Sequence, residues 1–195
     1  MMTKTDQNTS SQILSIAEKL VQTRGFNGFS YADISVEVGI SKASLHYHFP
    51  TKATLGQRLV ERYERSFLAA LDAIDADQVN ALAKLSAYVE IYVRVLHAGR
   101  MCLCGMLAAD YVTLPAAVQA SVRHFFVANE AWLVAVLSRG RMKTELVYVG
   151  KPSDVAHVLV CTLEGAMLLA RTDNDVGRFR ALAAAQVKML VPRRG

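Results

Sequence analysis

The stretch GISKASLHYHFPTK, residues 39–52, is the most polar short segment of a chain that is otherwise apolar and rich in alanine. It follows a glycine, and an apolar helical pattern resumes directly after it. Gly39 permits the positive φ that a tight turn between two helices requires. Two short helices joined in this way have the dimensions of a helix-turn-helix, and we expect the second to be capped by Ser41 and to end at about Tyr47.

This second helix is too short to be stable alone, so we expect it to present a surface rather than to build a core. Ile40 and Leu45 are expected to point inward, leaving an outward face of small and polar side chains. The major groove of DNA admits one α-helix, whose side chains reach base edges while neighbouring hydroxyls and cations contact phosphates. A polar loop between two core helices is the alternative interpretation. The outward residues are Lys42, Ala43, Ser44, His46, Tyr47 and His48, and those suited to phosphate contacts are Ser41, Ser44, Tyr47, His48 and Lys52.

Helical periodicity flanks this segment on both sides and predicts an all-α chain. An acidic, polar break at residues 75–80 interrupts the pattern and is the best compositional candidate for a boundary. The run ELVYV at residues 145–149 is the one candidate for extended structure, and one short run does not make a sheet. Helices are expected at about residues 9–24, 31–38, 41–47, 51–74, 79–98, 102–111, 115–139, 153–171 and 175–190.

The overall composition describes a folded protein that is mildly basic. Of the 195 residues, 52% are hydrophobic and 20% are charged, which is enough apolar material for a well-buried core. The net charge of +5 permits nucleic-acid binding without showing it. Because Lys and Arg outnumber Asp and Glu in both the first 65 residues and the remainder, the case for DNA rests on the local pattern.

Cysteine usage and the absence of targeting signals indicate a cytoplasmic protein. The chain has 3 cysteines, an odd number without a framework spacing, which argues for a reducing compartment. The N-terminal residues are polar and contain no apolar signal core. The longest apolar stretch, residues 155–170, contains His157 and Glu164 and is shorter than a bilayer-spanning helix. We therefore expect no membrane segment.

The first helix, the helix-turn-helix and the long helix after it follow one another in the first 60 or so residues. In this order and in its residues, the sequence resembles the TetR family of transcriptional regulators over about Ile13 to Leu59. Two positions depart from the family pattern: His46 stands where many members have tyrosine, and no acidic residue follows Lys52 closely. The residues that carry the resemblance are Ala17, Leu20, Gly25, Phe26, Ser30, Ile34, Val38, Gly39, Ser41, Lys42, Leu45, Tyr47, His48, Phe49, Lys52 and Leu55.

The resemblance implies a helix-turn-helix DNA-binding domain at residues 1–52 and a helical ligand-binding and dimerisation domain at residues 53–195, of which 53–75 form the linking helix. It implies a repressor that binds a palindromic operator as a homodimer and is released by a small-molecule effector. Leu45 and Phe49 are implied to be scaffold. The implied base readers are Lys42, Ala43 and His46, and the implied phosphate contacts are Ser30, Tyr31, Ser41, Ser44, Tyr47, His48 and Lys52.

The C-terminal part suggests how such a protein dimerises and what it senses. The segment 153–171 is apolar nearly all round, and with the amphipathic helix after it, it is expected to form the dimer interface; packing within a monomer is the alternative. Aromatic, methionine and cysteine side chains upstream are expected to line a pocket for a small apolar, aromatic or electrophilic effector, although such side chains also simply fill cores. These candidates are Tyr88, Tyr92, Cys102, Cys104, Met106, Phe125 and Trp132.

Cys102 and Cys104 have several interpretations. Free cysteines pack well as small apolar residues, which is the simplest one. Arg100 and a nearby helix start would favour the thiolate, and the segment resembles that of TetR relatives that respond to electrophiles, so a thiol sensor is the second. A metal site needs further ligands that do not follow, and a disulfide between such close neighbours has unfavourable geometry.

Two other classes of protein compete with a DNA-binding regulator. An enzyme with a cysteine nucleophile needs a base and an orienting partner, and the sequence offers only His157 with Cys161, which the dimer interpretation places in an interface. No glycine-rich phosphate loop, metal-ligand cluster or cofactor motif is present. A helical adaptor that binds only proteins leaves the polar surface of residues 42–52 unexplained. We therefore predict a regulator that is not an enzyme and needs no cofactor.

Overall fold

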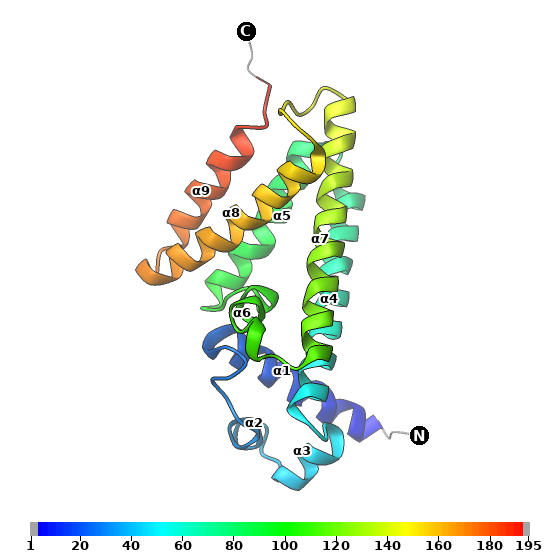
Figure 1. Ribbon diagram of the computed structural model, residues 1–195, viewed down its shortest axis with the longest axis vertical. Coiled ribbons are helices and arrows are strands. Elements are labelled where there is room, and N and C mark those ends of the chain that lie inside the picture. Colours follow the sequence, from blue (N-terminus) through cyan, green and yellow to red (C-terminus); the bar gives the residue numbers. More distant parts are fainter. Residues whose placement is uncertain (1–3, 193–195) are drawn as a thin grey trace. The chain divides into compact units, whose positions relative to one another are not determined.

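The computed structural model describes residues 4–192, and regular structure in this part of the chain is helical, as the sequence predicts. The segment ELVYV at residues 145–149 is not a strand; it lies in the irregular connection between the helices at residues 116–142 and 152–173. The elements, shown in Figure 1, are α1 (Lys4–Arg24), α2 (Tyr31–Val38), α3 (Lys42–His48), α4 (Lys52–Asp77), α5 (Ala81–His97), α6 (Leu103–Ala109), the 3-10 helix η1 (Tyr111–Thr113), α7 (Ala116–Met142), α8 (Pro152–Asp173) and α9 (Val176–Lys188).

Three expected boundaries are wrong by three residues or more, at the start of α1, the end of α4 and the end of α7, which extends to Met142 and not to about residue 139. Helix α1 begins at Lys4 and not at residue 9. Residues 4–8 are polar, so apolar periodicity in the sequence did not reveal that they belong to the helix. Helix α4 continues through the acidic segment to Asp77. Asp75 is held there by the Trp132 indole N–H, 3.0 Å from its Oδ2, and by the Lys84 ammonium, so residues 75–77 are part of a helix and not a break.

The chain forms two compact units. Of the described residues, unit 1 contains 4–65 and 102–125, and unit 2 contains 66–101 and 126–192. Helices α4 and α7 contribute residues to both units. The functional boundary that we expect at residue 52 stays a prediction, and the structure adds that unit 1 is assembled from two separate stretches of sequence.

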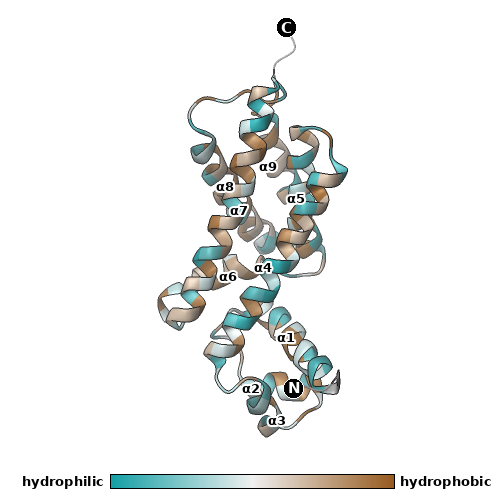
Figure 2. Cartoon of the chain, turned by 90° about the vertical axis from the view of Figure 1, so that its right-hand side faces the viewer, coloured by the Kyte–Doolittle hydropathy of each residue, from teal (hydrophilic) through white to brown (hydrophobic). Residues whose placement is uncertain are grey.

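Unit 1 is built around α1, which contacts α2, α3 and α6. Figure 2 shows α1, α2 and α3 grouped at the N-terminal end of α4. Burial of apolar side chains is the main stabilising contribution to such a cluster. The side chains that fill this core include Ile13, Ala17, Leu20, Val21, Ile34, Leu45 and Leu55, each 1% exposed or less.

Asp110 joins the two stretches of unit 1. Its Oδ2 accepts a hydrogen bond from the Phe26 backbone N–H at 2.7 Å and lies 3.4 Å from that of Asn27. The Asn27 side chain in turn donates to the Thr113 hydroxyl at 2.7 Å. Gly25, with φ of +81°, leaves room for this carboxylate, because a Cβ at that position would lie 2.9 Å from Oδ2. Glycine is therefore required there for both conformation and space.

In unit 2, α8 and α9 lie side by side and both pack against α5 (Figure 1). Helix α8 has 22 residues and is long and apolar enough to cross a membrane by length and composition, so the expectation that this segment is too short is wrong. The core helix of a soluble protein has the same character. The buried residues of α8 are Ala156, Leu159, Val160, Leu163, Ala166, Met167 and Ala170.

Candidate DNA interface

The turn between α2 and α3 has the geometry that the sequence predicts. The hydroxyl and the backbone N–H of Ser30 both donate to Asp33 Oδ2, at 2.6 and 2.7 Å, which fixes the start of α2. These hydrogen bonds lower the pKa of Asp33. Gly39 ends the helix at φ of +75°, and its N–H donates to the Ser35 carbonyl at 2.9 Å. A Cβ at Gly39 would meet nothing within 4 Å, so the glycine is needed for its backbone conformation and not for space.

Helix α3 has one buried side and one exposed side. Ser41 caps its start, with its Oγ accepting from the Ser44 N–H at 3.1 Å. Leu45 is fully buried and Phe49 is 3% exposed, which agrees with their expected scaffold role. The residues of the opposite side, which we call the α3 face, are the exposed Ser41, Lys42, Ala43, His46 and Tyr47 with the half-buried Ser44 and His48.

The imidazole of His46 is oriented by two contacts within unit 1. Its Nδ1 lies 3.2 Å from the Pro50 carbonyl oxygen, and its ring centroid lies 4.8 Å from that of Tyr31. A carbonyl oxygen can only accept, so Nδ1 carries the hydrogen. In the neutral ring Nε2 is then a hydrogen-bond acceptor on an exposed side chain. In this tautomer, Nε2 of His46 adds a hydrogen-bond acceptor to the α3 face.

Tyr31, one of the expected phosphate contacts, directs its hydroxyl toward the protein. The hydroxyl donates to the Phe49 carbonyl at 2.8 Å, which ties the first turn of α2 to the end of α3. Burial raises the pKa of Tyr31 to about 12, because the charged phenolate would lose hydration. In this arrangement Tyr31 positions α3, and its contact with phosphate stays a prediction.

We expect replacement of Tyr31 by phenylalanine to remove one tyrosine titration with a midpoint near 12. The folded-state pKa lies above the unfolded value of about 10. The neutral hydroxyl therefore contributes its full stabilisation below pH ~10, and this stabilisation is lost as the pH rises toward 12. The difference in tyrosinate absorbance between wild type and variant measures it. A midpoint near that of free tyrosine, in protein that is still helical by circular dichroism, would contradict the burial of this hydroxyl.

Lys52 is also directed inward, at the first residue of α4. Its ammonium donates to the Phe29 carbonyl at 2.6 Å and lies over the rings of Phe29 and Phe26, 4.2 and 4.9 Å from their centroids. Burial lowers the pKa of Lys52, and the carboxylates of Asp110 and Asp33 act in the opposite direction. The side chain therefore fastens α4 to the connection between α1 and α2, and its expected phosphate contact is untested.

Three of the expected effector-binding residues come together in unit 2, around a residue that sequence reasoning missed. The Tyr88 hydroxyl donates to Asn129 Oδ1 at 2.9 Å and lies 2.9 Å from the Tyr92 hydroxyl. The Trp132 ring stacks on that of Tyr88 with centroids 5.5 Å apart. Asn129 is fully buried, and within the described residues its Nδ2 has no hydrogen-bond partner. Its signal in the sequence is one amide within the apolar run FFVANEAWL.

The other four expected effector-binding residues belong to unit 1. Cys102 Sγ accepts from the Gly105 N–H at 3.4 Å and lies 3.9 Å from the Tyr63 hydroxyl, whose ring is 5.6 Å from that of Phe125. Cys102 and Cys104 are buried thiols, and Met106 is half-buried. The seven residues therefore form two groups, one in each unit.

Comparisons with known proteins agree with this geometry. Residues 13–59, which contain α2 and α3, match the family model of bacterial regulatory proteins, tetR family. A nucleoid occlusion factor SlmA from Colwellia psychrerythraea is 26% identical over 159 residues, 81% of this chain and 80% of that protein. A TetR transcriptional regulator from Legionella pneumophila is 27% identical, covers 97% of this chain and 98% of its own, and has a TM-score of 0.83.

A transcriptional regulator of the TetR family from Agrobacterium tumefaciens is more similar than either. It is 34% identical and superposes with a TM-score of 0.93. The match covers 96% of this chain and 100% of that chain, so it extends through both compact units and not only through the helix-turn-helix. From this similarity along the whole chain, together with the helix-turn-helix in unit 1, it follows that the protein belongs to the TetR family of transcriptional regulators.

Proposed function

We propose that this protein is a cytoplasmic, dimeric repressor that binds a palindromic operator through α3 and releases it when a small molecule binds in the helical core of unit 2. The observation that carries the proposal is the two-sided character of α3. Leu45 holds one side in the core, while Lys42, His46 and Tyr47 are exposed together on the other. Exposed polar and cationic side chains on an anchored helix suit insertion into a major groove.

The α3 face divides into groups with different tasks. Lys42 has the charge and reach to donate to guanine, while His46 Nε2, as an acceptor, suits the amino group of adenine or cytosine. Ala43 is small enough for close approach and contacts a thymine methyl. The hydroxyls and ring nitrogens around them fix the register on phosphates. These phosphate contacts are Ser30, Ser41, Ser44, Tyr47 and His48, and in this proposal Tyr31 and Lys52 position the face.

An exposed apolar strip on α8 and α9 supports the homodimer. Several large apolar side chains there point away from the core of unit 2, and contiguous exposed apolar surface of this kind marks interaction sites. A two-fold dimer through this strip would present two α3 faces to the two halves of a palindrome. The strip consists of Val158, Leu168 and Leu169 on α8 and Leu182 and Met189 on α9, each between 39% and 74% exposed.

The buried Tyr88–Asn129 group supports an effector site in unit 2. A buried amide nitrogen without a partner is unfavourable by about 1–3 kcal/mol, and a ligand acceptor would remove that penalty. The surrounding rings favour an apolar or aromatic molecule. The effector would then favour a dimer geometry in which the two α3 faces no longer match adjacent major grooves.

The experiment that tests the DNA-binding proposal is selection from random duplexes with the purified protein, followed by titration of the enriched sequence at several salt concentrations. We expect a palindrome whose affinity falls steeply with salt. Lys42→Ala should weaken binding roughly 10- to 100-fold and relax the preference at one base pair. Lys143→Ala, which removes an exposed lysine of unit 2, is the control and should leave base preference unchanged. Absence of any enriched sequence at low salt would overturn the proposal.

A second proposal, that a thiol of unit 1 responds to electrophiles, rests on Cys102. Its sulfur accepts hydrogen bonds from the Gly105 N–H in the first turn of α6 and from the Tyr63 hydroxyl of α4, 3.4 and 3.9 Å away. The same titration after treatment with N-ethylmaleimide separates this response from a reversible effector. Loss of operator binding in wild type and in the exposed-thiol control Cys161→Ser, but not in Cys102→Ser, supports it. Unchanged binding after treatment assigns Cys102 to packing.

A further inference from the structure

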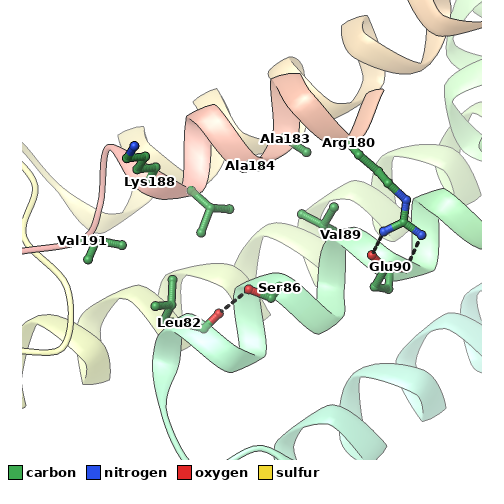
Figure 3. Close-up of a pocket in the computed structure, with 10 residues that line it drawn as sticks. Leu82, Ser86, Val89, Glu90, Arg180, Ala183, Ala184, Lys188 and Val191 are labelled. Carbon is green, nitrogen blue, oxygen red and sulfur yellow. Dashed lines mark hydrogen bonds and ion pairs between the residues drawn. The ribbon is translucent and has the colours of Figure 1, made fainter. Parts of the chain in front are cut away.

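A groove between α5 and α9 lies outside the surfaces discussed so far. It has a volume of about 350 Å³, which is in the range of small-molecule sites. Figure 3 shows its two walls, one from each helix, facing each other. None of the residues that we expected to bind an effector lines it. The lining consists of Leu82, Ser86, Val89 and Glu90 from α5 and Arg180, Ala183, Ala184, Val187, Lys188 and Val191 from the α9 segment.

The groove exists because α9 has small side chains where it faces α5. Ala183 is fully buried and Ala184 is exposed, and neither is large enough to fill the space opposite Leu82 and Val89. The α5 wall from Leu82 to Val89 spans two helical turns, or roughly 10 Å at 1.5 Å per residue. The space therefore runs along the two helices for about this length, and an alkyl chain laid along the helices would contact both walls.

The charges on the groove are arranged unequally. At one end the Arg180 guanidinium donates to both carboxylate oxygens of Glu90, and Nη2 lies 3.0 Å from Oε2. The two opposite charges therefore compensate each other. At the other end, Lys188 is exposed and forms no ion pair within the described residues. The lining thus has one uncompensated positive charge, at the end opposite the ion pair. A ligand with an apolar body and a single anionic head matches this distribution.

The groove is separate from the proposed dimer strip on the same helix. Leu182 and Ala184 are two residues apart, which places them about 200° from each other around α9. The side of α9 that lines the groove at Ala184 is therefore not the side that carries Leu182. The groove is also separate from the α3 face, which belongs to unit 1.

We propose that the α5–α9 groove binds an elongated amphipathic monoanion of the fatty-acid class, with its alkyl chain between Val89 and Ala184 and its carboxylate at Lys188. The alkyl chain gains from leaving water against the apolar walls. The carboxylate at an exposed lysine contributes less to affinity than the chain and mainly fixes the direction of binding. This site goes beyond the proposed repressor function, because binding here requires neither DNA nor a second copy.

The test is calorimetric titration of the full-length protein, without DNA, with decanoate and with decanol. We expect decanoate to bind and Ala184→Leu, which fills the groove, to weaken it at least tenfold. Lys188→Gln should weaken decanoate several-fold and leave decanol unchanged. Ala181→Leu, the same substitution on an exposed residue of α9 outside the groove, is the matched control and should bind as wild type does.

Each alternative outcome overturns a defined part of the proposal. Equal decanoate affinity in wild type and Ala184→Leu, with wild-type circular dichroism, places the ligand elsewhere. If Ala184→Leu does not fold, Ser86→Leu fills the groove from the α5 wall and gives the same comparison. Unchanged decanoate affinity in Lys188→Gln overturns the anion preference. Because no arm contains DNA, failure of this proposal is distinguishable from failure of the repressor proposal.

Discussion

Replacing Leu45 with alanine is expected to lower the free energy of unfolding by about 2–5 kcal/mol and to abolish operator binding. Leu45 is fully buried and is the side chain by which α3 is held against its neighbours in unit 1. With only seven residues, α3 has little stability of its own. Loss of this side chain therefore removes both packing and the position of the whole α3 face.

Urea denaturation followed by circular dichroism measures the first effect, and titration of the selected duplex measures the second. Tyr47→Ala is the control on the same helix, since Tyr47 is 71% exposed. That variant should keep wild-type stability within about 0.5 kcal/mol while binding DNA more weakly. An operator affinity within twofold of wild type in Leu45→Ala would show that α3 does not need this anchor.

Leu168→Glu is expected to convert the dimer to a monomer and to weaken operator binding by on the order of 100-fold or more. Leu168 belongs to the apolar strip on α8 and is 56% exposed. In a two-fold interface each substitution appears twice, so two carboxylates would be buried in the interface without partners. The loss of affinity arises because each half-site is then bound independently.

Analytical ultracentrifugation gives the oligomeric state, and the same duplex titration gives the affinity. Val112→Glu is the matched control: Val112 is 92% exposed in η1 of unit 1 and lies outside the strip. It should remain dimeric and bind normally. A dimeric Leu168→Glu protein with wild-type affinity would exclude this strip as the interface.

Features encoded by neighbouring residues were predictable from the sequence. Ser41 and Thr51 cap helices through side-chain oxygens that accept from residues three positions later, so the evidence for each cap lies within four residues. The end of α2 is also encoded locally, because Gly39 can adopt the positive φ that stops the helix. The burial of Leu45 and the exposure of Lys42 follow from helical periodicity. This is why the helix-turn-helix and its exposed face could be inferred before the structure.

Features that depend on distant partners were not predictable. The Tyr31 hydroxyl and the Lys52 ammonium have the chemistry of phosphate contacts, but carbonyls 18 and 23 residues away accept their hydrogen bonds. The acidic segment that begins at Asp75 has the composition of a helix break. It remains helical where Trp132, 57 residues later, donates a hydrogen bond to the Asp75 carboxylate. The α5–α9 groove depends on the packing of two helices about 100 residues apart, which no local pattern contains.

The carboxylate of Asp110 has a consequence for how such proteins are recombined. It covers the backbone N–H groups at the end of α1 from a position 84 residues further along the chain. In a chimaera that takes only the first 65 residues from this protein, the Phe26 N–H would face the host residue that replaces Asp110. Grafting the DNA-reading module between relatives therefore requires that residues 102–125 travel with it, as a two-piece cassette.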